Sequence, residues 1–181
     1  MGIIDADISF SVVGETNDWI LLNKPAPLIV HPTSGKVEPT LLGGVEKLLS
    51  YEITNGAKLS IINRLDRETS GLVLIAKNKP AAREFGRSME RREIDKEYDA
   101  ICHGWPEWDE RSLEAPILRK GEVTSSPIWV KQMVHPGGRD CVTKFKVVSR
   151  FARNNKKFCV LRVFPKTGRM HQIRVHAAHL G

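Results

Sequence analysis

The stretch INRLDRETSGLVLIAKN, residues 62–78, joins a charged turn directly to an apolar segment. Asp66 lies between Arg64 and Arg67, and the apolar run that begins at Gly71 is typical of a buried β-strand. The preceding segment KLSIIN is also apolar, so the pattern predicts a strand, a loop that carries Asp66, and a second strand. Such an aspartate is either part of an exposed ion-pair turn or a catalytic carboxylate that needs a nearby cation to stay ionised.

Strand and helix patterns alternate around this stretch without repeats. The pattern predicts two strands around a turn at Glu15–Asp18, an extended piece at Leu28–Val30, a strand in KEYDAICHG, and a hairpin that joins VTKFKVVSRF to KKFCVLRVFP across ARNNKK. Helices are predicted in PTLLGGVEKLLS, NKPAAREFGRSMERREI and TGRMHQIRVHAAHLG, with Thr40, Asn78 and Thr167 as N-caps. These elements predict a single domain, residues 1–181, of the α+β class, with a mixed, largely antiparallel central sheet flanked by helices.

The composition is that of a globular protein, with 41% hydrophobic and 27% charged residues. No apolar stretch approaches the roughly 18 residues of a membrane span, and the N-terminal segment lacks the basic region of a signal peptide. The three cysteines, which have no C-x-x-C spacing, indicate reduced thiols. We therefore expect a cytoplasmic protein, without a membrane partner and monomeric.

The positive charge is concentrated after residue 60. Residues 1–60 carry 4 Lys/Arg and 7 Asp/Glu, a net of −3, whereas residues 61–181 carry 24 and 14, a net of +10. Clusters such as REFGRSMERREIDK and RFARNNKK suit a polyphosphate backbone, although a solvated basic face without a partner has the same composition.

Several single residues allow both a functional and a structural interpretation. Tyr98 is either a pocket wall or a half-buried core tyrosine, and Arg169 is either a phosphate contact or a surface residue. Lys24 is expected either to touch RNA or to be solvated. His176 and His179 have helical i, i+3 spacing, but neither cysteines nor carboxylates follow at ligand spacing, so no metal is expected.

The stretch NRLDRETSGLVLIAKN resembles the catalytic motif of pseudouridine synthases of the RluA type. Three further stretches resemble segments of that family in the same order: LLNKPAPLIVHP, KEYDAICHG and PKTGRMHQIRVHAAHLG. The resemblance implies an RNA isomerase that acts on structured RNA, either ribosomal or transfer RNA. It also implies a cleft that binds RNA and a reaction that needs no cofactor.

The resemblance assigns roles to individual residues. Asp66 is the essential carboxylate, which attacks C1′ or C6 or removes the 2′ proton. Arg64 fills the gap that the flipped uridine leaves in the base stack. Tyr98 packs against the uracil, and Arg174 is the buried partner of Asp66. Substrate-binding roles fall to Arg64, Leu65, Arg169 and Ile173.

The sequence also departs from the family pattern. Asn63 stands where many relatives have His, and Pro27 stands where Gly is common. No segment resembles an S4 RNA-binding domain, and the sequence stops before the H-P-I-x-G-D segment with which the family continues. We therefore expect a C-terminally incomplete catalytic domain. Two alternatives to the isomerase stay open: an inactive relative that only binds RNA, and a nucleoside hydrolase that would need a second carboxylate such as Glu68.

Overall fold

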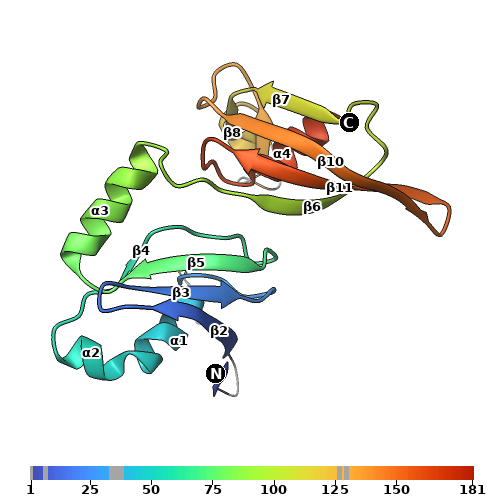
Figure 1. Ribbon diagram of the computed structural model, residues 1–181. Coiled ribbons are helices and arrows are strands. Elements are labelled where there is room, and N and C mark those ends of the chain that lie inside the picture. Colours follow the sequence, from blue (N-terminus) through green and yellow to red (C-terminus); the bar gives the residue numbers. More distant parts are fainter. Residues whose placement is uncertain (1, 6–7, 33–38, 126–127, 129–130) are drawn as a thin grey trace. The chain divides into compact units, whose positions relative to one another are not determined.

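The computed structural model describes residues 2–5, 8–32, 39–125, 128 and 131–181. The chain divides into two compact units, Met1–Glu93 and Ile94–Gly181. Each unit has its own antiparallel sheet and its own hydrophobic core, coloured blue to green and green to red in Figure 1. The α+β class and the antiparallel pairing are as predicted. In place of one central sheet, the described residues form a five-stranded sheet in the first unit and a four-stranded and a two-stranded sheet in the second.

The first unit is built on a five-stranded sheet in the order β1-β2-β3-β5-β4. Its strands are β1 (Gly2–Asp5), β2 (Ile8–Glu15), β3 (Trp19–Lys24), β4 (Ser60–Ile61) and β5 (Gly71–Ala76). Strand β1 had not been predicted, and β4 is shorter than the apolar run KLSIIN suggested. The buried core of this unit comes from β2, β3, β5, α1 and the extended piece around residue 29.

Three helices complete the first unit: α1 (Leu41–Leu48), α2 (Ser50–Thr54) and α3 (Lys79–Glu90). Both predicted N-caps are confirmed, because each short polar side chain accepts a hydrogen bond from a backbone N–H of the first turn. Thr40 accepts from Gly43 N at 3.0 Å, and Asn78 accepts from Ala81 N at 3.0 Å.

The second unit is built on a four-stranded sheet in the order β6-β11-β10-β7 and a two-stranded sheet of β8 and β9. Its elements are β6 (Tyr98–His103), β7 (Glu110–Glu114), β8 (Ile117–Arg119), the 3₁₀ helix η1 (Lys120–Glu122), β9 (Gln132–Val134), β10 (Val142–Arg153), β11 (Lys156–Pro165) and α4 (Gln172–His179). The buried cluster Phe145, Cys159, Leu161 and Val163 packs against Ile173, Ala177 and Leu180 of the α4 segment.

The predicted β10–β11 hairpin is confirmed, with Asn154 and Asn155 as its two-residue loop. Their φ angles are 50° and 58°, which is the positive-φ conformation of a type I′ turn and is tolerated best by glycine and asparagine.

The start of α4 differs from the prediction. Thr167 is not its N-cap: the helix begins at Gln172, after His171 with a φ of 53°, and Met170 is exposed before it. Within the described ranges, every helix is too short or too polar to cross a membrane.

Candidate functional site

The loop that carries Asp66 is joined to strand β5 by the side chain of Asn63. Backbone pairing of β4 with β5 ends near Ile62, whose N–H donates to Leu74 O at 2.9 Å. Asn63 then continues the ladder: its Nδ2 donates to Leu72 O at 3.0 Å, and its Oδ1 accepts from Leu74 N at 2.8 Å. A carboxamide carries a donor and an acceptor side by side, as a peptide group does. The loop therefore leaves the sheet one residue later than the backbone pairing alone would allow.

Asp66 begins a tight turn in which its carbonyl oxygen accepts from Thr69 N at 3.0 Å. Arg67 and Glu68 occupy the central positions, are both exposed, and pair with each other at 2.8 Å. Such an exposed ion pair contributes little stability. Asp66 itself is half-buried. Arg67 thus pairs with Glu68, and the small stabilisation from this exposed pair does not by itself account for the turn.

A buried lysine holds the other side of this turn. Lys24, at the end of β3, is 0% exposed, and its Nζ donates to Pro25 O at 2.9 Å, Leu28 O at 2.7 Å and Arg67 O at 3.2 Å. Arg67 O also accepts from Leu28 N at 3.0 Å. Burial lowers the pKa of Lys24, while the charges of Glu68 and Asp66 act in the opposite direction.

Both sequence-based expectations for Lys24, an RNA contact or a solvated side chain, were wrong. The strand period carried a signal: Ile20, Leu22 and Lys24 alternate on one face of β3, and all three are buried. One of the three carbonyl groups around the ammonium belongs to a turn 43 residues further along the chain, which the local sequence does not indicate.

Arg64 is exposed and lies beside His31. Its Nη1 is 3.3 Å from His31 Nε2, and the guanidinium can act only as the donor in this contact. Leu65 turns the other way and packs against the core of the first unit. Of these two neighbours, only Arg64 has a polar side chain exposed at the surface.

In the second unit, Tyr98 is the first residue of β6 and pairs with Val163 of β11. Its half-buried side chain packs against the buried cluster that also contacts Ile173. Both interpretations of Tyr98 are thus compatible with its position: its ring belongs to the edge of the core and is not fully covered.

The segment after β11 is organised by Gln172, which is buried and fully hydrogen-bonded. Its Oε1 accepts from Thr167 Oγ1 and from Arg169 N, both at 2.9 Å. Its Nε2 donates to Val142 O at 3.0 Å and to Thr143 Oγ1 at 2.9 Å. One carboxamide therefore fastens the start of α4 to the start of β10, and Thr167 serves this network instead of capping the helix.

The network continues to His176, which is 0% exposed. Its Nε2 donates to Ala115 O at 2.9 Å, which leaves Nδ1 to accept from Thr143 Oγ1 at 2.8 Å. Burial lowers the pKa of His176, and the bond to Ala115 opposes that shift. With both nitrogens engaged, His176 is structural, and the suggested pair with His179 is not formed as a ligand set.

Two arginines near α4 are exposed. Arg169 donates from Nε to Asp140 O at 3.2 Å, and Arg174 projects from the helix one residue after Ile173. The exposure of Arg174 within the second unit leaves its predicted burial beside Asp66 as a prediction. Its pairing with Asp66 stays a prediction, because the two residues belong to different units. Among the described residues, no group of three His, Cys, Asp or Glu side chains has the arrangement of a metal site.

Comparison with known proteins identifies the family. The family model described as RNA pseudouridylate synthase matches residues 18–179, nearly the whole chain. The chain belongs to the RNA pseudouridylate synthase family. The resemblance noted in the Asp66 stretch is thereby confirmed.

Curated relatives within the RNA pseudouridylate synthase family include ribosomal large subunit pseudouridine synthase D of Escherichia coli strain K12, 36% identical over 176 residues. The protein of the same name from Haemophilus ducreyi is 35% identical over 182 residues. Each alignment covers 96% of this chain and 50% of the relative, so the chain spans about half the length of these relatives.

Solved structures support the fold of this family member. Human RNA pseudouridylate synthase domain containing 1 matches with a TM-score of 0.73 at 23% identity, over 100% of this chain and 69% of the human one. Human RNA pseudouridylate synthase domain containing 4 matches with a TM-score of 0.69 at 23% identity, over 93% and 64%. At this identity the likeness concerns the fold alone.

Proposed function

We propose that this chain isomerises uridine to pseudouridine in ribosomal large subunit RNA, with Asp66 as the catalytic carboxylate. Family membership and the printed names of the curated relatives support the reaction and the RNA class. The observation that carries the role of Asp66 is its turn: Asn63 fastens one side to β5, and buried Lys24 fastens the other. An exposed ion-pair turn needs neither support.

The reaction exchanges one bond for another within the same nucleotide. The bond between N1 of uracil and C1′ of ribose breaks, the base turns, and a bond forms between C5 and C1′. The hydrogen on C5 leaves as a proton, and N1 ends with a proton. Electrons and atoms balance without an oxidant, so the protein has to supply a carboxylate as nucleophile or base and a site that retains the detached base.

The remaining site residues take the roles that the resemblance gives them. Arg64 enters the gap in the base stack, which suits an exposed guanidinium beside His31. Tyr98 and Ile173 form the apolar wall for uracil, supported by their position at the edge of one buried cluster. Arg174 contributes the cation of the site, and exposed Arg169 contacts phosphate.

Target uridines inside folded RNA have to leave the base stack, which costs a few kcal/mol. Phosphate contacts offset that expense, and the net of +10 over residues 61–181 supports this part of the proposal.

The proposal is tested by tritium release from ribosomal large subunit RNA and transfer RNA, each transcribed in vitro with tritium at uridine C5. The intact chain should release tritium from the ribosomal RNA, and Asp66→Asn should release none while keeping its circular dichroism melt. Glu68→Gln is the matched control, because Glu68 lies two residues away, is exposed, and pairs with Arg67.

The outcomes separate the alternatives. No release by a folded parent that still binds RNA would establish the binding-only relative and overturn the isomerase. Free uracil in the supernatant would establish a hydrolase. Release by Asp66→Asn would remove Asp66 from the mechanism, and release from transfer RNA alone would correct the substrate.

A further inference from the structure

Among the described residues, no strand flanks the end of the β10–β11 hairpin, residues 151–157, on either side. Strand β7 pairs with β10 over Val142–Lys146, and β6 pairs with β11 over Phe158–Val163. The two hairpin strands nevertheless stay paired out to Arg153 and Lys156. Figure 1 shows this part extending past the other strands of its sheet. The extension adds nothing to the buried cluster of the second unit, so its stability has another source.

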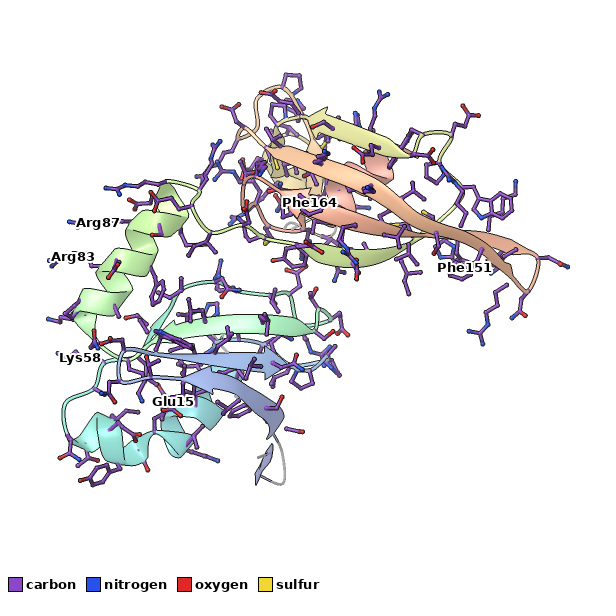
Figure 2. All side chains as sticks on the ribbon, viewed as in Figure 1. Glu15, Lys58, Arg83, Arg87, Phe151 and Phe164 are labelled. Carbon is purple, nitrogen blue, oxygen red and sulfur yellow. The ribbon has the colours of Figure 1, made fainter. Side chains whose placement is uncertain are left out.

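Aromatic side chains brace the hairpin end. Phe151 and Phe158 face each other across the strands, with ring centroids 5.5 Å apart and planes at 16°, and His103 lies 4.9 Å from Phe158. Trp105 donates from Nε1 to the carbonyl oxygens of both phenylalanines, at 3.1 Å each. Phe151 and Trp105 stay 37% and 44% exposed, and Phe151 lies on the extended part in Figure 2.

Positive charge on the hairpin end is left uncompensated. Arg153, Lys156 and Lys157 are exposed, and within the described part of the chain none of them has an acidic partner within ion-pair distance. Lys157 Nζ lies 4.8 Å from the centre of the Trp105 ring, a cation–π contact.

Cations nearer the middle of the same sheet have acidic partners. Lys144 and Lys146 both pair with Glu110 at 3.4 Å, and Arg150 pairs with Asp109 at 2.8 Å. Along β10 and β11, the cations of the hairpin end thus differ from those nearer the middle of the sheet in having no carboxylate partner among the described residues. An RNA phosphate would supply the negative charge there.

We propose that the hairpin end is a second RNA-docking surface, at which Arg153, Lys156 and Lys157 bind backbone phosphates and Phe151 stacks on an unpaired base. The inference rests on the proposed function, since it assumes an RNA substrate. Cations interleaved with exposed aromatic rings are the combination that single-stranded nucleic acid requires, because phosphates need charge and every base offers a π-face. The core of a protein–protein interface is depleted of lysine, whereas Lys156 and Lys157 lie beside the rings here.

The proposed docking surface binds RNA independently of the catalytic residues. The Asp66 turn acts on one nucleoside, whereas a projecting hairpin with charge and rings holds a neighbouring loop of the same RNA. Contacts of this kind fix the position and orientation of the bound RNA and leave the chemical step unchanged.

The test is filter binding of the 181-residue chain to in vitro transcribed ribosomal large subunit RNA at several KCl concentrations. Arg153→Glu with Lys156→Glu should weaken binding about tenfold or more at low salt. It should also reduce the slope of log affinity against log salt by about 1.4, since each single-stranded phosphate contact contributes about 0.7. Phe151→Ala should weaken binding about fivefold or more with the slope unchanged, because stacking is not ionic.

Lys47→Glu with Lys58→Glu is the charge-matched control, because both lysines are exposed, lie within the net-negative residues 1–60, and change the net charge by the same amount. Lys58 is labelled in Figure 2. Equal weakening by the two charge-reversal pairs would overturn the proposal, as would unchanged binding of Arg153→Glu with Lys156→Glu. Unchanged binding of a folded Phe151→Ala would overturn the stacking contact. Tritium release measured on the parent reports separately on the isomerase, so failure of one claim does not hide the other.

Discussion

Lys24 Nζ donates a hydrogen bond to the carbonyl oxygen of Arg67, 3.2 Å away, across 43 residues of sequence. Because Arg67 directly follows Asp66, the end of strand β3 and the candidate catalytic turn form one hydrogen-bonded unit. A buried ammonium surrounded by carbonyl oxygens is stable only while all of these groups stay in place, since an unpaired buried charge is costly. The position of the carboxylate therefore depends on a lysine that touches no substrate in our proposal.

Lys24→Met should lower the free energy of unfolding by about 2–3 kcal/mol, because it removes the donor to three carbonyl oxygens. The methionine fills a similar volume, so packing is largely kept. We expect tritium release to fall by more than the loss of folded protein explains, as the turn loses its anchor. Urea denaturation and initial rates on the same preparation check this, with the exposed Lys58→Met as the control.

Asn63 should tolerate replacement by histidine better than by aspartate or leucine. Imidazole offers one donor and one acceptor, as the carboxamide does, whereas aspartate lacks the donor to Leu72 O and leucine lacks both groups. We expect Asn63→His to stay within about 1 kcal/mol of the parent and Asn63→Leu to lose about 1–3 kcal/mol. Thermal melts and tritium release check the order. Equal loss in all three variants would show that shape, and not hydrogen bonding, governs this position.

Burial of His176 should make the second unit less stable in mild acid. Its pKa in the folded chain is lowered, so the unfolded chain binds more protons below the ordinary histidine pKa of about 6.5. Stability is complete above that pH and is lost as the pH falls toward the folded pKa, by up to about 1.4 kcal/mol per pH unit. Urea denaturation between pH 5 and 8 checks the slope.

The control for this pH dependence is His179→Gln, an exposed position on the same helix. It should keep the acid sensitivity, whereas His176→Gln should lower stability at neutral pH and flatten the profile. A steep profile that persists in His176→Gln would assign the effect to another group.

Gln172→Leu should detach the start of α4. The carboxamide makes four hydrogen bonds in this buried network, so we expect a loss of about 3 kcal/mol or more. Gln172→Glu keeps the two bonds to Oε1 but places a carboxylate against Val142 O, and should also be destabilising. Amide hydrogen exchange along α4 and urea denaturation check both variants. Unchanged exchange in Gln172→Leu would mean that apolar packing of Ile173, Ala177 and Leu180 holds the helix by itself.

Local signals in the sequence predicted local structure well. Thr40 and Asn78 cap their helices because a cap involves only the next three residues, and Asn154 with Asn155 suffices for a two-residue hairpin. Thr167 looked like the same kind of cap. It failed because Gln172 competes for its hydroxyl and because His171 takes a left-handed conformation, so the helix begins five residues later.

The supports of the candidate site were not predicted, because their partners are distant in sequence. Asn63 bonds a strand that begins eight residues later, and His176 bonds Ala115, 61 residues earlier. The motif resemblance identified Asp66 without explaining how it is held. The burial of Lys24 was not predicted, since a charged residue gives little indication of its surroundings until its neighbours are known.

The hydrogen bonds between Asn63 and β5 determine when the loop that carries Asp66 becomes ordered. Because Asn63 is hydrogen-bonded to β5, the loop cannot move without breaking these bonds. The loop therefore loses its backbone conformational entropy when the chain folds. When a nucleoside reaches Asp66, the backbone of the loop that carries this carboxylate is already ordered. In our proposal the RNA is then the component that rearranges on encounter, and the protein acts as the rigid template against which it does so.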